Sequence, residues 1–429
     1  MAGDATGVTR YRLDAAGLCC APSAAGARGH SPNVAVRPRG FSGGRMQTTV
    51  SGPSSPVEFH PQVPEVEGAY TRFPLSCKLW GNQGRNDMRA SPTGFAIALL
   101  TTVVAAGMAS AQSSYPCTET NANLPNPYRL VANWASPPRP WSPISAVAVD
   151  PRNNLWAVDR CETDDCIPVI ELGPDGKTLR NFGAGLFVEP HQAAIDKDGN
   201  LWVADATPKG MKGMQVTKLS PDGRVLLKLG KPGQGAGQTG LDIFDSPTGV
   251  AVASNGDVYI SEGHGETNVN NSRIMVFTKD GKFIKTFATR GTGDGQLRSP
   301  HALAFDSQDH LYVADRGNSR IAIFDKDGSF LVAWKQFGRP SGLAIDKNDM
   351  LYVADSQSSD TPGAANYNPG CARGIRIGSV KDGKVMYFIP PPVPPDPKMQ
   401  PPIGIVVDGN GTIYAASDDQ KDIKQYVKN

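Results

Sequence analysis

Two histidines follow a proline in similar sequence contexts, His191 in "VEPHQAAID" and His301 in "SPHALAFD". A neutral imidazole is a common ligand for divalent transition metals, and its pKa near neutrality also suits acid–base catalysis. In related segments elsewhere, the corresponding position is assigned to Ile144, Thr248, Ser341 and Ile403. Imidazoles at equivalent positions of two copies indicate a shared task, whereas a lone buried histidine is more often a hydrogen-bonded structural residue.

The elements that must position these histidines belong to a repeat. Its copies begin at Pro143, Pro190, Pro247, Pro300, Pro340 and Pro402. Each copy has an apolar run such as "AAID", a polar turn such as Asp198-Gly199-Asn200 and a second apolar run such as "NLWVAD". An Asx-Gly pair between two short apolar runs is a strong hairpin signal. Most copies continue with a third and a fourth run, so the repeat predicts an all-β fold, a six-bladed β-propeller.

The last copy stops after its third strand, "DIKQYVKN" at the carboxyl end. The segment "YRLVANW" (128–134) precedes the first copy and has the pattern of a fourth strand. We therefore expect this N-terminal strand to complete the last blade and close the ring, which removes exposed sheet edges.

Strands one and two of a blade form an antiparallel hairpin, so residues before strand one and after strand two lie at the same end. Besides the two histidines, this places Arg160, His264 and Arg316 on one face near the axis. His310 falls in a hairpin turn, where we expect it to be exposed. The aspartates of the "VAD" segments, Asp205, Asp315 and Asp355, are expected to bond to backbone, and Arg273 and Arg320 to tie blades together.

These segments resemble NHL-repeat propellers of the NHL/TolB-like type. More closely, residues 128–429 are similar to the peptidyl-α-hydroxyglycine α-amidating lyases and their bacterial relatives. The resemblance implies a secreted propeller that holds zinc through histidines and splits a C-terminal α-hydroxyglycine into an amide and glyoxylate. It implies zinc ligands at His191 and His301 and a catalytic arginine at Arg160.

The resemblance is incomplete at three positions. The family's third zinc ligand falls at Ile403, and its calcium-binding aspartate falls at Gly404, so calcium has lost a ligand here. The family's catalytic tyrosine falls at His264, and imidazole can replace phenolate as a base. In this interpretation zinc binds the substrate hydroxyl, His264 takes its proton and Arg160 holds the substrate carboxylate bidentately. Glu262 or His264, both from blade three, could also supply a third ligand.

Two other functions remain open. A non-catalytic propeller would bind a peptide, glycan or protein partner at the same face, with the histidines as polar lining, because the fold alone does not decide function. A lactonase-like hydrolase would need a carboxylate-rich metal site, for which Glu262 is the obvious axial residue. In each case we expect a small molecule or peptide as the ligand at the channel mouth.

The N-terminal part differs in composition from the repeats. Residues 1–111 carry ten Lys and Arg against six Asp and Glu, whereas residues 112–429 carry 33 against 35. The near-neutral repeat region argues against nucleic acid as a partner. The segment "MRASPTGFAIALLTTVVAAGMASAQ" from Met88 has the charge, apolar run and A-x-A site of a secretory signal peptide.

The domain assignment follows from that signal. We interpret residues 1–87 as a disordered extension or a mis-assigned start, 88–111 as the signal peptide, 112–127 as a linker and 128–429 as the propeller. Cleavage would leave no transmembrane segment, and it predicts a secreted or periplasmic protein.

Four cysteines would remain after cleavage: Cys117, Cys161, Cys166 and Cys371. An even number in an oxidising compartment favours disulfides. Cys161 and Cys166 share the polar loop "DRCETDDCI" and form the expected pair, which leaves Cys117 for Cys371. A metal site at the close pair is the alternative.

Overall fold

A computed structural model describes residue 117 and residues 124–235, 240–265, 271–392 and 401–429. The predicted extension (1–87), the signal peptide (88–111) and most of the linker (112–127) lie outside the described residues. The first strand begins at Tyr128, where the sequence predicts the propeller to start.

The chain forms six four-stranded antiparallel sheets, one for each copy of the repeat. Blade one consists of β2 (Ile144–Val149), β3 (Leu155–Asp159), β4 (Val169–Leu172) and β5 (Thr178–Phe182). Blade two consists of β6 (Pro190–Ile195), β7 (Leu201–Asp205), β8 (Gln215–Leu219) and β9 (Val225–Leu229). Blade three consists of β10 (Pro247–Val252), β11 (Val258–Glu262), β12 (Arg273–Phe277) and β13 (Phe283–Phe287). Blade four consists of β16 (Pro300–Phe305), β17 (Leu311–Asp315), β18 (Arg320–Phe324) and β19 (Phe330–Trp334). Blade five consists of β20 (Pro340–Ile345), β21 (Met350–Asp355), β22 (Gly374–Ser379) and β23 (Val385–Ile389). Blade six consists of β24 (Gly404–Val407), β25 (Ile413–Ser417), β26 (Asp422–Lys428) and β1 (Tyr128–Val131). A small parallel pair, β14 (Thr289–Arg290) with β15 (Gln296–Leu297), and a 3-10 turn, η2 (Arg316–Asn318), complete the described elements.

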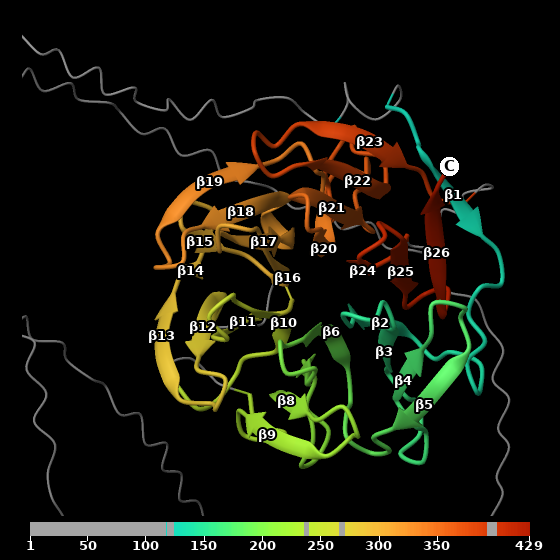
Figure 1. The fold of residues 1–429 in the computed structure, drawn as a ribbon. Coiled ribbons are helices and arrows are strands. Elements are labelled where there is room, and N and C mark those ends of the chain that lie inside the picture. Colours follow the sequence, from blue (N-terminus) through green and yellow to red (C-terminus); the bar gives the residue numbers. More distant parts are fainter. Residues whose placement is uncertain (1–116, 118–123, 236–239, 266–270, 393–400) are drawn as a thin grey trace, which may run out of the picture. The chain divides into compact units, whose positions relative to one another are not determined.

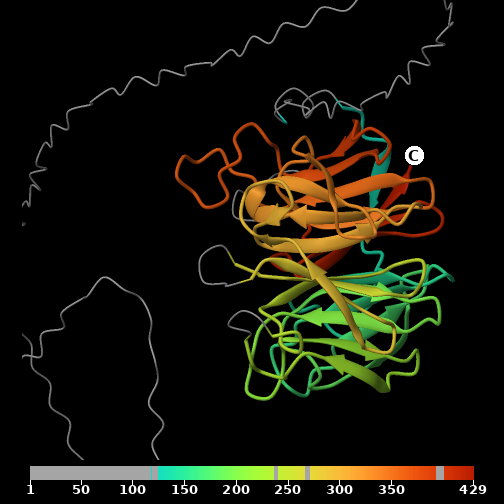
Figure 2. The same ribbon diagram turned by 90° about the vertical axis from the view of Figure 1, so that its left-hand side faces the viewer.

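The first strands of the blades surround a common axis (Figure 1). Each contacts the first strand of the next blade, in the order β2, β6, β10, β16, β20, β24, and β24 contacts β2. Figure 2 shows the same blades from the side. The predicted six-bladed propeller is therefore confirmed.

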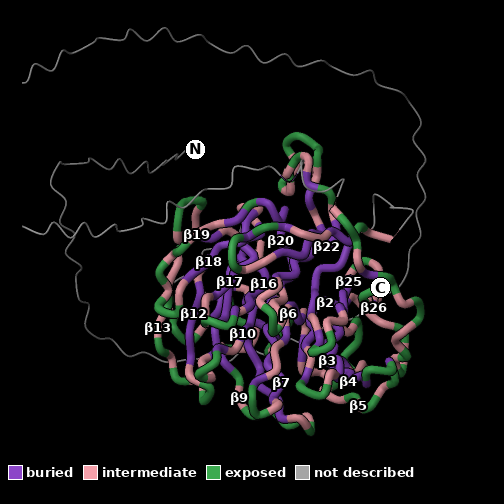
Figure 3. The backbone as a smooth tube through the Cα atoms, turned by 45° about the horizontal axis from the view of Figure 1, so that its top comes forward, coloured by how far each residue is buried: buried purple, intermediate pink, exposed green. Residues whose placement is uncertain are grey.

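Burial explains the residue pattern of each strand. The second strands are almost completely buried, as in "LWVAD" of β7, because blades pack against both of their faces. The fourth strands β5 and β13 instead alternate between half-buried and exposed residues, because only one face is covered. Figure 3 shows this change from buried inner strands to exposed outer turns.

The ring is closed by chain ends that are far apart in sequence. Strand β1 pairs antiparallel with β26, with Tyr128 opposite Lys428 and Val131 opposite Gln425. The N-terminal strand is thus the fourth strand of the last blade, as predicted. Separating two blades would require this strand pair to break or an inter-blade core to open.

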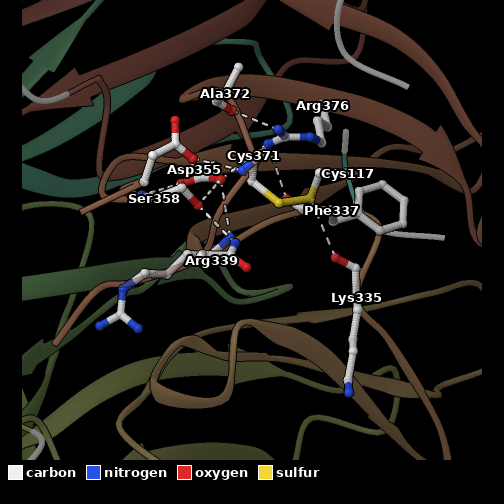
Figure 4. The surroundings of a disulfide bond; sticks show 12 residues. Cys117, Lys335, Phe337, Arg339, Asp355, Ser358, Cys371, Ala372 and Arg376 are labelled. Atoms are coloured by element: carbon white, nitrogen blue, oxygen red, sulfur yellow. Dashed lines mark hydrogen bonds and ion pairs between the residues drawn. A yellow bond between two sulfur atoms is a disulfide. The ribbon is translucent and has the colours of Figure 1, made fainter. Parts of the chain in front are cut away.

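A disulfide joins Cys117 to blade five of the propeller. Cys117 is bonded to Cys371, which lies in the long loop between β21 and β22 (Figure 4). The same view shows the buried ion pair between Arg376 and Asp355, whose Nη1 and Oδ2 atoms are 3.2 Å apart. The pairing of Cys117 with Cys371 was expected by elimination, and the structure agrees.

Candidate functional site

In several blades, the loop that leads into the first strand is held by the aspartate at the end of the second strand. In blade two, the carboxylate of Asp205 accepts hydrogen bonds from the backbone N–H groups of Val188 and Glu189, at 3.0 and 2.6 Å. Asp315 accepts the N–H of Arg298 in the same way, at 2.7 Å. The predicted backbone role of the "VAD" aspartates is confirmed. These bonds fix the loop immediately before each histidine.

The two arginines predicted to tie blades together bind the segments that connect consecutive blades, β9 to β10 for Arg273 and β13 to β16 for Arg320. Arg320 pairs with Asp315 at 2.7 Å and donates to the carbonyls of residues 293 and 296, each at 2.8 Å. Arg273 pairs with Glu262 at 2.5 Å and donates to the carbonyl of Gly240. The loops that approach the mouth are therefore anchored to buried charges.

Three histidines converge at this end of the channel. His191 and His301 are 4% and 3% exposed, and His264 is partly buried beside them. The ring centroid of His191 lies 4.5 Å from that of His264 and 5.2 Å from that of His301. The Nε2 atoms of His191 and His264 are 3.4 Å apart. One ligand atom from each ring can be chosen so that all three lie within 4.8 Å of one another.

Backbone carbonyls orient two of the rings. His191 Nδ1 lies 3.1 Å from the carbonyl oxygen of Glu189, and His301 Nδ1 lies 2.7 Å from that of Ser341. A carbonyl only accepts a hydrogen bond, so each Nδ1 carries the proton and each Nε2 presents a lone pair. A backbone carbonyl on the remote ring nitrogen is the usual outer partner of a metal-binding histidine.

All three imidazoles are held in the neutral form. Burial lowers the pKa of His264 to about 3, with Arg316 and Arg160 adding charge repulsion. Burial also lowers the pKa of His191 and His301 well below the ordinary value, and the neighbouring charges act in the same direction. Neutral rings are what metal coordination requires.

The separation of two of the triad nitrogens matches that in a zinc site. With Zn–N bonds of about 2.0–2.1 Å, the nitrogens of a tetrahedral site are about 3.3 Å apart. The 3.4 Å between His191 Nε2 and His264 Nε2 matches this separation. Three imidazoles also leave a fourth position open for water or substrate, as in catalytic zinc sites. The residues present therefore suit the metal that the family resemblance implies.

The prediction that Ile144 occupies the position equivalent to His191 is wrong. Ile144 is completely buried in the core between blades one and six. Ser145 instead lines the cavity at the axis, together with His191, His301, Ser341 and Ile403. Blade one has one more residue between its proline and the aspartate ending strand one than blade two has, so counting from Pro143 gives the wrong residue. Ile144 pairs with Asp159 as Pro190 pairs with Asp205 in blade two, so Ser145 is the counterpart of His191.

Gln192, the neighbour of His191, joins three blades beneath the triad. Its Oε1 accepts the N–H groups of Val250 and Leu303, each at 3.0 Å. Its Nε2 donates to the carbonyl of Leu303 at 2.8 Å. This side chain therefore fixes blade two against blades three and four where the histidines meet.

Arg160 also lies at this mouth, in contact with two acids. Its Nη1 is 3.3 Å from Oε1 of Glu189 and 3.6 Å from Oδ2 of Asp418. Arg316 lies on the other side of the triad, with Nη2 3.3 Å from His264 Nε2. The sequence placed Arg160 and Arg316 on this face but gave no role to Glu189 or Asp418. Asp418 follows strand two of blade six, as Arg160 follows strand two of blade one, so the repeat contained the signal.

Two further expectations concern residues outside the triad. Glu262 is fully buried against Arg273 and the N–H of Asp245, so its carboxylate is engaged away from the three histidines. His310 is 32% exposed in its side chain, and its Nδ1 lies 2.9 Å from Oδ2 of Asp306. It is therefore less exposed than predicted, but it belongs to a turn.

The predicted Cys161–Cys166 disulfide is present, directly after Arg160. Both sulfurs are bonded, so this loop offers no pair of thiolates for a metal. Arg139 lies beside the bridge, with Nη2 3.7 Å from Cys161 Sγ and Nη1 3.0 Å from Oδ2 of Asp159. Two disulfides are typical of proteins from oxidising compartments. In the part of the chain that the structure describes, no helix is long and apolar enough to cross a membrane.

The chain is similar in sequence to known proteins. The NHL repeat matches residues 297–324. The chain is 30% identical over 221 residues to "Peptidyl-alpha-hydroxyglycine alpha-amidating lyase 2" of Drosophila melanogaster, an alignment that covers 46% of this chain and 50% of the relative. It is 32% identical over 195 residues to "NHL repeat-containing protein 3" of Homo sapiens, covering 44% and 54% of the two chains. The chain thus spans about half the length of these relatives.

Among solved structures, a gluconolactonase from Xanthomonas campestris aligns with a TM-score of 0.50 and 16% identity, over 70% of this chain and 90% of that one. At this identity the likeness concerns the fold alone.

Proposed function

We propose that this NHL-repeat propeller, similar in sequence to amidating lyases, is an exported metal-dependent lyase that cleaves a carbinolamide at its channel mouth. The observation that carries the proposal is the convergence of three neutral imidazoles, His191, His264 and His301. The substrate class follows the printed name of the Drosophila relative, and export follows the sequence signal and the two disulfides.

His191, His264 and His301 would hold the metal, zinc by their chemistry. Bound zinc would act as a Lewis acid that lowers the pKa of a coordinated hydroxyl. The Nδ1–H tautomers of His191 and His301 leave both Nε2 lone pairs available to a metal. The metal geometry thus depends on loops anchored by Asp205 and Asp315 and on the inter-blade bonds of Gln192.

The reaction moves one proton and breaks one bond. The carbinol C–N bond breaks, the carbinol oxygen becomes a carbonyl, and its proton ends on the departing amide nitrogen. Arg160 and Arg316 stand on opposite sides of the triad as hydrogen-bond donors for substrate oxygens. Their partial burial strengthens such bonds relative to those in water.

His264 has two possible roles, and its geometry favours that of third ligand. Its Nε2 lies 3.4 Å from His191 Nε2, a separation that two ligands of one ion can have. The role predicted from the sequence is instead proton acceptor. Removing the side chain separates the two: loss of bound zinc indicates a ligand, whereas retained zinc with lost turnover indicates a base.

The test begins with zinc content after reconstitution of the purified full chain. We expect about one zinc per chain in the wild type, and loss of most of it in His191→Ala, His301→Ala and His264→Ala. His310→Ala, on a turn away from the triad, is the matched control and should keep its zinc. Glyoxylate release from a peptidyl-α-hydroxyglycine then tests for turnover.

The alternative is a non-catalytic propeller that binds a peptide, glycan or protein partner. It is favoured by Ile403, which places an apolar side chain in the cavity where the amidating lyases place a ligand. A wild type that stays metal-free in excess zinc, and that does not differ from His191→Ala, would contradict the lyase proposal and favour this one.

A further inference from the structure

The guanidinium of Arg160 is already engaged at each of its nitrogens. Nε donates to the carbonyl of Pro190 at 3.4 Å, and Nη2 donates to Oγ of Ser145 at 2.9 Å. Nη1 faces the carboxylates of Glu189 and Asp418 at 3.3 and 3.6 Å. A substrate carboxylate bound in the bidentate manner needs two adjacent N–H groups on one edge of the fork. Each edge of Arg160 includes a nitrogen that already has a partner.

The two acids are held in these positions by their own blades. Glu189 Oε2 accepts a hydrogen bond from the hydroxyl of Thr207, and its backbone N–H is bound by Asp205. Asp418 Oδ1 accepts the N–H of Asp419 at 2.9 Å. Glu189 comes from blade two and Asp418 from blade six, the two neighbours of blade one. Their side chains remain 27% and 19% exposed, so both border the space that a ligand enters.

Two acids already face the guanidinium of Arg160. Glu189 Oε1 and Asp418 Oδ2 lie 3.3 and 3.6 Å from its Nη1, whereas Arg316 lies beside His264. A free substrate carboxylate beside Arg160 would meet two carboxylates on the same guanidinium. Like charges at such separations repel, and displacing either acid would leave it partly buried and unpaired. An uncharged amide avoids this cost, because its N–H can donate to an acid and its oxygen can accept from Arg160.

We infer that the substrate of this site presents a neutral carboxamide beside Arg160, and that Glu189 and Asp418 are the residues that exclude a free carboxylate there. The inference rests on the proposed function in placing the reacting carbon at the histidine triad. It assigns the substrate class as an α-hydroxyglycinamide, whereas the family resemblance implies a free α-hydroxyglycine. Cleavage would then yield an amide and glyoxylamide.

The test compares two substrates that differ only in this group. The zinc-reconstituted full chain is given N-benzoyl-α-hydroxyglycine or N-benzoyl-α-hydroxyglycinamide, and the shared product benzamide is measured by chromatography. We expect kcat/KM for the amide to exceed that for the acid at least tenfold. The double variant Glu189→Gln/Asp418→Asn should shift this ratio toward the acid by a similar factor. Asp327→Asn, which removes an exposed acid on a distant turn of blade four, should leave it unchanged.

A binding measurement decides the inference independently of turnover. Calorimetric titration with N-benzoylglycine and N-benzoylglycinamide, which lack the reacting hydroxyl, should show tighter binding of the amide to the wild type. Faster cleavage or tighter binding of the acid by the wild type would overturn the inference, as would no binding of either. If neither substrate is cleaved while the amide still binds more tightly, the lyase proposal fails and the preference for a neutral group stands.

Discussion

Acid should destabilise the metal-free protein through its buried histidines, and His264 allows the size of the effect to be calculated. Its pKa falls from 6.5 in the unfolded chain to about 3 in the folded protein. Between these values the unfolded state binds the proton and the folded state does not, so stability falls as the pH falls below 6.5. At 1.36 kcal/mol per pH unit, lowering the pH from 7 to 5 should remove about 2 kcal/mol on account of this one side chain.

The measurement is urea denaturation of metal-free protein at pH 7 and pH 5, for the wild type and for His264→Gln. Glutamine does not titrate, so the variant should lose about 2 kcal/mol less than the wild type between the two pH values. His264→Asn provides the same comparison with a shorter side chain. Other titrating groups contribute nearly equally to wild type and variant and cancel in the difference. Equal pH dependence in all three proteins would refute the conclusion that His264 is held neutral by burial.

Three other predictions concern the scaffold. Gln192→Leu should reduce the free energy of unfolding by about 2–4 kcal/mol, because two buried backbone N–H groups of neighbouring blades lose their acceptor; a loss below about 1 kcal/mol in urea denaturation would argue against this role. Replacing Cys161 and Cys166 by serine should cost about 2 kcal/mol in the chain-entropy description of a short loop, measured by the same method without reductant. Trp202→Ala should cost about 3–5 kcal/mol, because the fully buried indole packs between blades two and three, and a thermal midpoint equal to that of the wild type would exclude it.

Most of the fold could be predicted from the sequence, because the same pattern of apolar runs and turns occurs in six copies. The Asx-Gly turn occurs in three of the copies, but a polar turn with apolar runs on both sides recurs in all six, and this recurrence specifies a hairpin in every blade. The completion of the last blade by Tyr128–Val131 followed from counting strands. Counting from the proline failed in blade one, because Pro143 stands one residue earlier than the prolines of the other blades. Ile144 therefore pairs with Asp159 as Pro190 pairs with Asp205, and Ser145 rather than Ile144 reaches the axis.

The candidate site could be predicted only in part, because the positions of some of its side chains depend on loop conformation. His191 and His301 sit on repeated strands, so their common level was predictable. His264 follows Gly263, whose φ of 110° favours glycine, since a Cβ there would meet the carbonyl oxygen of Asn271. Side-chain direction after such a turn cannot be obtained from spacing. Arg160, Glu189 and Asp418 come from three different blades, so their contact could not be predicted from the sequence of one repeat.

The position of His264 also changes the meaning of Ile403. A site with three-fold placement on a six-bladed ring would take its ligands from blades two, four and six, and then isoleucine in blade six would leave it incomplete. The structure brings together rings from blades two, three and four instead, because the loop after β11 carries His264 inward to His191. The third nitrogen is therefore supplied from between the other two. The apolar side chain of Ile403 lies across the axis from this group and lines the cavity that the ligand must share. Loss of the blade-six ligand is thus compatible with a complete three-imidazole site, provided that the loop holding His264 keeps its glycine turn.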